Sequence, residues 1–267
     1  MPVQGKFFQN PGSSGSAFYD YQIEQSCRFS REESTHMTRT PSSTGNRRTF
    51  TFSTWLKRSR DDNDAFFGVY ANSSTEAAMK FGNGGTHSGK LQLYQYTGSF
   101  PINVQTNARY RDSTGWYNIV IRVDTTQSTA NNRVRLYVNG TLNDNTDNST
   151  NTQPSQNYDT FFNTSGNPNF VGWYGNSGSN RFDGLMAETI LADGYSYDAS
   201  YFGTTKNNIW TPVDYHNTTG NYGTNGFYLK YQNASALGDD SSGNNNDFTT
   251  SGLSADNQLI DSPTFGS

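Results

Sequence analysis

The chain has 267 residues and a formal net charge of −4, and only 16% of its residues are charged. This length suits one large β domain or two small ones and is enough to bury a real core. A nucleic-acid-binding protein usually carries a basic patch, and a membrane span needs about 20 consecutive apolar residues. The sequence has neither feature. We therefore expect neither nucleic-acid binding nor membrane insertion.

The N-terminal segment, residues 1–20, contains Gly, Pro and Ser residues around Phe7 and Phe8. Two interpretations stay open: a flexible tail, or an arm that becomes ordered on a partner with Phe7 and Phe8 as its anchors. The segment lacks the long apolar stretch of a signal peptide, so synthesis in the cytoplasm is expected. The single cysteine, Cys27, alternates with Ile23 and Phe29 and is expected to be a buried apolar residue rather than a nucleophile.

Short runs of alternating polar and apolar residues predict β-strands along the whole chain. Turn-forming Gly, Asn, Asp and Ser residues separate these runs, and no window shows a sustained helical period. One helical turn is expected at 197–202. Predicted strands outside the central hairpin are 21–30, 47–57, 65–70, 77–81, 90–96, 170–174, 185–191 and 227–231. Such a pattern is typical of an all-β sandwich or barrel with at most two short helical turns.

The strongest pattern is the hairpin at residues 115–140. Apolar residues alternate with polar ones in both arms, a polar loop joins the arms, and an Asn139-Gly140 turn follows. Residues predicted to face the core are Tyr117, Ile119, Ile121, Val134, Leu136 and Val138. An apolar sheet face needs a second layer to cover it, which favours a sandwich.

The amino-acid composition of the chain changes at residue 210. Residues 210–267 are rich in Gly and Asn, and the alternating residues at 227–231 predict one further strand there. The remainder of this segment is expected to be ordered loop or a peripheral hairpin. Residues 21–209 are therefore predicted to form the sandwich, and residues 210–267 to close it.

Three segments, at residues 26–59, 115–140 and 182–194, together resemble a known family. They are similar to the concanavalin A-like, laminin-G-type (LamG-like) jelly-roll family, and more narrowly to LamG-like modules of virion proteins from marine and cyanobacterial bacteriophages. The similarity spans roughly residues 21–263 and implies an antiparallel jelly-roll β-sandwich. One departure concerns the order of segments, because the DSSGN motif follows the sandwich here and often precedes it in relatives. This segment either closes the same sandwich from its other end or is the remnant of a second module, and closure is favoured.

The resemblance, together with the lack of a signal peptide and of a catalytic constellation, favours a function without catalysis. Such modules occur in capsid decorations, head fibres and tail fibres, so the leading hypothesis is a virion protein made in the host cytoplasm and bound to other virion proteins. A second hypothesis is a soluble or tail-fibre lectin that binds host surface glycans, and a third is a glycan-cleaving enzyme. The low surface charge and the aromatic N-terminal segment favour a homo-oligomer, expected as a trimer, attached to the particle through residues 1–20.

No catalytic residue is assigned. Retaining glycosidases use two carboxyl groups about 5 Å apart, and the Glu-x-Asp-x-x-Glu pattern of concanavalin-like glycanases is absent from the sequence. Glu188 is the one acid in the middle of a strongly predicted strand and is interpreted as a structural, hydrogen-bonded residue. The histidines His36, His87 and His216 stand in unrelated loop-like contexts without the spacing of metal ligands.

Two oxygen-rich clusters are candidate Ca²⁺ sites, and no other cofactor is expected. The first contains Asp61, Asp62 and Asp64, and the second contains Asp239 and Asp240. Ca²⁺ takes six to eight oxygen ligands, and the resemblance implies a site of this kind at the rim of a sandwich. The preference of Asp and Asn for loops explains both clusters without a metal, so both interpretations stay open.

Four aromatic residues near predicted turns are candidates for glycan binding: Trp173, Tyr174, Tyr94 and Tyr96. Exposed aromatic faces stack on the C–H surfaces of sugars. Packing in the core or at a sheet edge is the alternative interpretation for the same residues.

Overall fold

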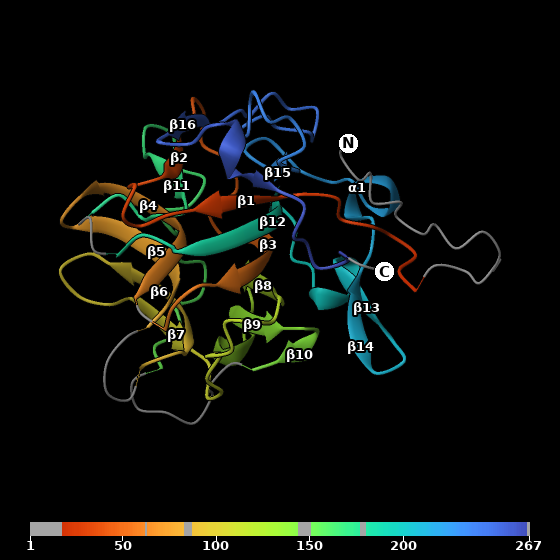
Figure 1. Ribbon diagram of the computed structural model, residues 1–267. Coiled ribbons are helices and arrows are strands. Elements are labelled where there is room, and N and C mark those ends of the chain that lie inside the picture. The colour runs from red at the N-terminus through yellow and green to blue at the C-terminus, as the bar shows by residue number, and fades with distance from the viewer. Residues whose placement is uncertain (1–17, 62, 83–86, 144–150, 177–179, 266–267) are drawn as a thin grey trace, which may run out of the picture.

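The protein is a sandwich of two antiparallel β-sheets (Figure 1). The computed structural model describes residues 18–61, 63–82, 87–143, 151–176 and 180–265. Strands account for 40% of the chain and helices for 6%. The prediction of an all-β antiparallel jelly-roll sandwich is therefore confirmed.

The first sheet has eight strands in the order β10-β9-β8-β3-β12-β1-β17, and β15 pairs with β12 outside this path. The central pair, β3 and β12, runs antiparallel over ten residues each and is interrupted by a bulge between Ala187 and Ile190. The strands are β1 (Ser26–Phe29), β3 (Thr49–Arg58), β8 (Tyr117–Asp124), β9 (Val134–Val138), β10 (Thr141–Leu142), β12 (Gly184–Asp193), β15 (Phe227–Leu229) and β17 (Gln258–Leu259).

The second sheet has seven strands in the order β16-β2-β11-β4-β5-β6-β7. Its strands are β2 (His36–Arg39), β4 (Asp64–Asn72), β5 (Thr75–Phe81), β6 (Leu91–Tyr96), β7 (Ile102–Gln105), β11 (Asn169–Val171) and β16 (Thr249–Ser251). A separate ribbon pairs β13 (Gly203–Lys206) with β14 (Ile209–Pro212). The short helices are η1 (Ala130–Asn132), η3 (Ala199–Tyr201), α1 (Tyr215–Thr218) and η4 (Ala255–Asn257).

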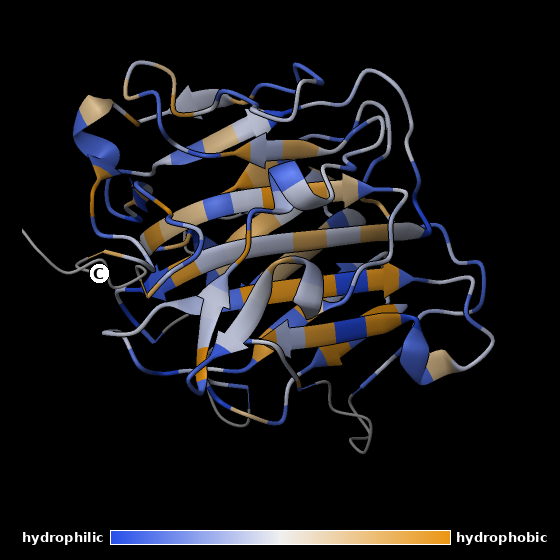
Figure 2. Cartoon of the chain, turned by 90° about the vertical axis from the view of Figure 1, so that its right-hand side faces the viewer, coloured by the Kyte–Doolittle hydropathy of each residue, from blue (hydrophilic) through white to orange (hydrophobic). Residues whose placement is uncertain are grey.

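The main core lies between the two sheets. It contains the apolar residues that alternate with polar ones in the predicted strands. Phe52 of β3 stacks on Phe67 of β4 at a ring-centroid distance of 4.7 Å. Figure 2 shows hydrophobic and hydrophilic residues mixed along the strands, while hydrophilic residues dominate many of the loops. Five of the six predicted core residues of the hairpin are buried: Ile119, Ile121, Val134, Leu136 and Val138.

The other face of the first sheet is also covered, so the hairpin is covered on both sides and not only on the face predicted to meet the core. Tyr117 is partly exposed and packs at the edge of the main core, whereas Val120 on the opposite face is fully buried. Val120 belongs to a second cluster with Ile190, Tyr215 and Tyr228. The chain after β12 folds back over this face and supplies those aromatic residues.

Segments without clear alternation also form strands. β2, β7, β10, β13, β14, β16 and β17 were not predicted, and the described residues contain four short helical turns rather than at most two. The C-terminal segment contributes to both sheets, because β15 pairs with β12, β17 with β1, and β16 with β2. The helical turn expected at 197–202 is present as η3.

Asp193, the last residue of β12, holds three loops together. Its buried carboxylate accepts hydrogen bonds from the backbone N–H groups of Asn46 at 2.7 Å and Asn225 at 2.9 Å, and from Nδ2 of Asn163 at 3.1 Å. Burial raises the pKa of Asp193. Cys27 is fully buried in the main core, and burial raises the pKa of its thiol, so the prediction of a buried cysteine is confirmed.

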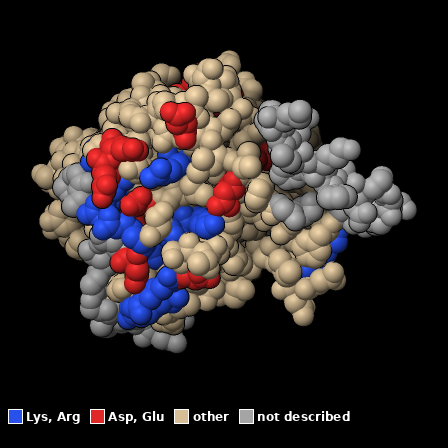
Figure 3. All heavy atoms as spheres, in the orientation of Figure 1, with Lys and Arg blue, Asp and Glu red and all other residues tan. Residues whose placement is uncertain are grey.

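Charged residues of both signs lie close together on the face shown in Figure 3, and much of the remaining surface in that view is uncharged. Mixed charge of this kind matches the absence of a basic patch in the sequence. Ion pairs with partly exposed side chains include Lys57–Asp261 at 2.9 Å, Arg111–Asp61 at 3.1 Å and Arg60–Asp183 at 3.7 Å. In the described part of the chain, no helix is both long and apolar enough to cross a membrane.

Candidate functional site

A pocket of about 480 Å³ lies on the outer face of the second sheet, above β5, β6 and β7. Alternation along these strands explains its position, because apolar residues such as Met79 and Leu93 face the core and their neighbours face outwards. The antiparallel register sets Lys80 opposite Gln92 on β6, and Tyr94 opposite Asn103 on β7. Residues that line the pocket are Glu76, Lys80, Gly82, His87, Gln92, Tyr94, Phe100, Asn103 and Tyr174.

One end of the pocket is aromatic. Phe100, in the loop between β6 and β7, is 51% exposed and lies 5.0 Å from the Tyr96 ring and 6.0 Å from the Tyr94 ring. Tyr174 packs edge-on against Tyr94 at 6.3 Å. A side chain at Gly68 on β4 would meet Tyr174 Cβ at 2.2 Å, so this glycine is what allows Tyr174 to lie against the sheet.

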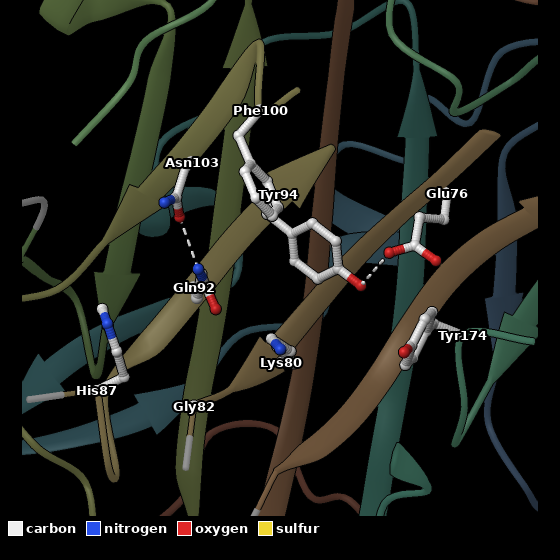
Figure 4. A pocket seen from close by; sticks show the side chains of 9 residues that line it. All are labelled: Glu76, Lys80, Gly82, His87, Gln92, Tyr94, Phe100, Asn103 and Tyr174. Carbon is white, nitrogen blue, oxygen red and sulfur yellow. Dashed lines mark hydrogen bonds between the residues drawn. The ribbon is translucent and has the colours of Figure 1, made fainter. Parts of the chain in front are cut away.

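Hydrogen bonds fix most of the polar side chains around the pocket (Figure 4). The Tyr94 hydroxyl donates to Glu76 Oε1 at 3.3 Å, and Gln92 Nε2 donates to Asn103 Oδ1 at 2.6 Å. Burial raises the pKa of Tyr94 and lowers the pKa of Lys80 to about 8, although Glu76 partly opposes the change at Lys80. The pocket therefore offers amide, hydroxyl and ammonium groups beside an exposed aromatic ring, a combination suited to a polar ligand with an apolar face.

The structure brings together three of the four aromatic residues predicted to bind glycans. Tyr94, Tyr96 and Tyr174 form one outward-facing cluster. Trp173 does not line the pocket, because its ring lies against His36 and Phe170 and beneath the Arg181 guanidinium, 4.1 Å away. Glycan binding by these residues stays a prediction.

Sequence reasoning missed the polar half of the pocket. Glu76 and Lys80 are four residues apart on β5 and so share a face with each other. Gln92 shares a face with Tyr94 on the neighbouring strand in the same way. The sequence does contain a signal for this half of the pocket, namely outward-facing polar residues on two predicted strands. Only the pairing register of those strands shows that these residues lie side by side.

The first acidic cluster is engaged in ion pairs with arginine. Asp64 is fully buried and its Oδ2 lies 3.0 Å from Arg58 Nη2, while Asp61 contacts Arg58 at 3.5 Å and Arg111 at 3.1 Å. Asp62 lies outside the described residues. These ion pairs account for Asp61 and Asp64 without a metal, and Ca²⁺ binding by this cluster stays a prediction.

The second acidic cluster organises its own loop. Asp240 accepts hydrogen bonds from the backbone N–H groups of Tyr228 at 2.8 Å, Ser242 at 2.9 Å and Asn246 at 2.9 Å. Asp239 accepts from Asn233 Nδ2 at 2.9 Å. Among the described residues, no group of three or more His, Cys, Asp or Glu side chains is placed to hold a metal ion. Ca²⁺ binding remains an untested prediction, as does the anchor role of Phe7 and Phe8, which lie outside the described residues.

Glu188 is buried in the opposite sheet, at the bulge of β12, with a positive φ of 50°. Its carboxylate accepts hydrogen bonds from the hydroxyl groups of Tyr21 at 2.9 Å and Tyr228 at 2.6 Å. Burial raises the pKa of Glu188 from the ordinary value of 4.5 to about 7, although both hydrogen bonds oppose the rise. This carboxylate joins the segment before β1 to β15 and does not line the pocket above β5 and β6.

We expect Glu188 to make stability depend on pH. Its folded-state pKa lies above its unfolded-state value, so its contribution to stability is complete below about pH 4.5 and is lost as the pH rises through about 7. The difference between the two pKa values corresponds to about 3 kcal/mol. Between about pH 4 and 8, urea unfolding should show a loss of about this size in the wild type relative to Glu188→Gln. The control Glu33→Gln, at an exposed position, should follow the wild type; parallel profiles for Glu188→Gln and the wild type would contradict the expectation.

A family model described as the concanavalin A-like lectin/glucanases superfamily matches residues 32–194, more than half of the chain. No curated protein matches the sequence.

Among solved structures, a heptameric SAP-like pentraxin from Limulus polyphemus is 12% identical, with a TM-score of 0.45 over 64% of this chain and 77% of that chain. The CBM40 of the IT-sialidase from Ruminococcus gnavus, bound to α2,3 sialyllactose, is 12% identical and has a TM-score of 0.41. The match covers 61% of this chain and 90% of that chain. A tailspike domain of bacteriophage CBA120 is 10% identical and has a TM-score of 0.40. The match covers 60% of this chain and 24% of that chain.

Proposed function

The chain belongs to the concanavalin A-like lectin/glucanases superfamily, and from this premise we propose that it binds carbohydrate, without cleaving it, in the pocket above β5 and β6. The observation that carries the proposal is the pocket itself, in which the exposed ring of Phe100 stands beside hydrogen-bonding amides and hydroxyls. A sugar ring has an apolar C–H face and a rim of hydroxyl groups. An aromatic side chain and fixed polar groups complement these two features.

The carboxylates of the chain favour binding over hydrolysis. Glycoside hydrolysis uses two carboxyl groups on either side of the scissile bond. One carboxylate, Glu76, is present among the residues that line the pocket, and it already accepts hydrogen bonds from Tyr94 and from Asn176 Nδ2 at 2.8 Å. Incubation with any glycan that binds should therefore release no new reducing ends, and the appearance of such ends would overturn the non-enzymatic part of the proposal.

The binding site can be tested with a substitution that spares the core. Phe100→Ala should weaken glycan binding by roughly tenfold to a hundredfold, because burying a Phe side chain contributes about 1.5–3 kcal/mol. The measurement is a glycan array with the purified protein, followed by titration calorimetry on the ligands found. Since Phe100 is half exposed, the variant should fold as the wild type does.

Phe265→Ala is the matched control, because Phe265 is 63% exposed and does not line the pocket. It should bind as tightly as the wild type. Absence of any glycan ligand for the wild-type protein would overturn the proposal. If Phe100→Ala bound the glycan as tightly as the wild type, the site would lie outside this pocket.

The sequence favours a second, compatible function as a subunit of a virus particle. The observation behind it is the resemblance of residues 26–59, 115–140 and 182–194 to LamG-like modules of bacteriophage virion proteins. In this proposal the chain is a homo-oligomeric decoration or fibre subunit, expected as a trimer, that is attached through residues 1–20 and presents the sandwich to host glycans.

Mass spectrometry of purified particles tests the virion role, and light scattering of the purified protein tests the trimer. Removal of residues 1–20 should leave the sandwich folded and abolish its incorporation into particles. A truncated protein that incorporates at the normal copy number would show that the attachment lies elsewhere. Detection in infected-cell lysate and never in particles would overturn the virion role, while leaving glycan binding unaffected.

A further inference from the structure

Lys80 lies in the middle of the pocket, surrounded by the other lining side chains (Figure 4). Its ammonium nitrogen is 4.9 Å from the centroid of the Tyr94 ring, a cation–π contact. None of the described residues accepts a hydrogen bond from this nitrogen. An ammonium group has three donors, so a partly buried lysine without an acceptor retains unused hydrogen-bonding capacity inside the site.

The acid of the pocket does not meet this need. Glu76 is four residues from Lys80 on the same strand, which separates their Cα atoms by about 13 Å, and its carboxylate is held by Tyr94 and Asn176. In Figure 4 Lys80 lies between His87 on one side and Glu76 on the other, and Glu76 pairs with Tyr96 across the strands. His87 is oriented by a hydrogen bond of 2.9 Å between its Nδ1 and Oε1 of Gln105.

We propose that the ligand of this pocket is an acidic oligosaccharide, whose carboxylate or sulfate group binds Lys80 while a neutral sugar ring lies against Phe100. This inference rests on the proposed carbohydrate-binding function and adds the charge of the ligand and its direction in the site. Anionic oxygens supply the acceptors that Lys80 lacks, in a place where partial burial strengthens the attraction. Glu76 repels the same anionic group from its own side of the pocket, so we expect this group to lie on the side of Lys80 that faces His87.

The experiment compares each acidic ligand with its own neutral counterpart. Titration calorimetry would use an oligogalacturonide, the same oligosaccharide after reduction of its carboxyl groups, a carrageenan oligosaccharide as the sulfated probe, and the same oligosaccharide after desulfation. The wild type should bind at least one acidic probe about tenfold or more tightly than the neutral counterpart of that probe, with an affinity that falls as salt is added. The acidic probe that binds identifies whether carboxylate or sulfate is preferred.

Variants then assign the preference to Lys80. Lys80→Met should remove the preference for the acidic probe, and Lys80→Arg should retain most of it. Lys206→Met is the matched control, because Lys206 lies on β13, outside the pocket, and its loss changes the net charge equally. This control should bind all probes as the wild type does.

The dependence on pH gives a readout that a purely structural role of Lys80 would not produce. The other titratable groups that line the pocket are Glu76, His87, Tyr94 and Tyr174. Because burial lowers the pKa of Lys80 to about 8, its positive charge is lost earlier than that of an exposed lysine. The preference for the acidic probe should therefore decline between about pH 7 and 9.5 in the wild type and stay absent in Lys80→Met.

The possible failures are distinguishable. Equal affinity for acidic and neutral probes would overturn this inference and leave carbohydrate binding intact. Binding of no saccharide at all would overturn the proposed function itself. A preference for the acidic probe that survives in Lys80→Met would also refute the role of Lys80, because the anionic group would then be recognised elsewhere.

Discussion

Replacing Asp64 with alanine should lower the free energy of unfolding by about 3–5 kcal/mol. The Asp64 carboxylate and the Arg58 guanidinium are 0% and 1% exposed, and they pair at 3.0 Å. Arg58 also donates to the backbone carbonyl of Tyr110 at 2.5 Å and lies over the Phe81 ring. Removal of the carboxylate leaves a buried positive charge with less compensation than it has in the native protein.

Asp61→Ala is the matched control for this substitution. Asp61 contacts the same guanidinium at 3.5 Å but is 33% exposed, so its loss should cost less than about 1 kcal/mol. Urea unfolding of both variants at neutral pH gives the comparison, and equal effects would contradict the assignment of the buried pair. A rise in the wild-type melting temperature with CaCl₂ that both substitutions abolish would instead support the Ca²⁺ prediction.

Ile121→Ala should cost about 2–5 kcal/mol, because it removes methylene and methyl groups from the packed interior and leaves a cavity. Ile121 is fully buried on β8 between β3 and β9, opposite Phe52 on one side and Leu136 on the other. Both neighbours belong to the same core cluster, so little collapse can fill the space.

Ile209→Ala makes the same chemical change at a position that is 50% exposed. Its effect on the free energy of unfolding should stay within about 0.5 kcal/mol. Thermal and urea unfolding of the two variants show whether the loss of stability comes from the burial of Ile121 or from any Ile→Ala change. If Ile121→Ala melted like the wild type, the assignment of this face of the hairpin to the core would be wrong.

The local pattern of the sequence was sufficient for the long strands. In β8 and β9 every second residue is apolar, and a strand of five or more residues can place such a set on one face only. The same reasoning located β3, β5, β6 and β12, and the turn residues between them indicated a sandwich. The resemblance of three segments to LamG-like modules agreed with the family to which the chain belongs.

Short polar strands could not be found in this way. β2 (His36–Arg39) and β16 (Thr249–Ser251) contain little alternation, and they are strands because they pair with each other and because β2 also pairs with β11. Such pairing depends on where the partner strand lies, and those partners are more than a hundred residues away in the chain. The burial of Val120 has the same origin, since residues from β12, α1 and β15 cover its face.

The sequence by itself determined the all-β class, the core face of the hairpin and three aromatic candidates that do lie together, Tyr94, Tyr96 and Tyr174. Only the tertiary structure decided which polar groups join them. Strand register set Lys80 beside Tyr94, and a glycine at position 68 gave Tyr174 its place on the sheet. The same folding paired Asp64 with Arg58 inside the protein. Alternation is a property of neighbouring residues, whereas a pocket or a buried ion pair depends on contacts across strands, which a single sequence does not specify locally.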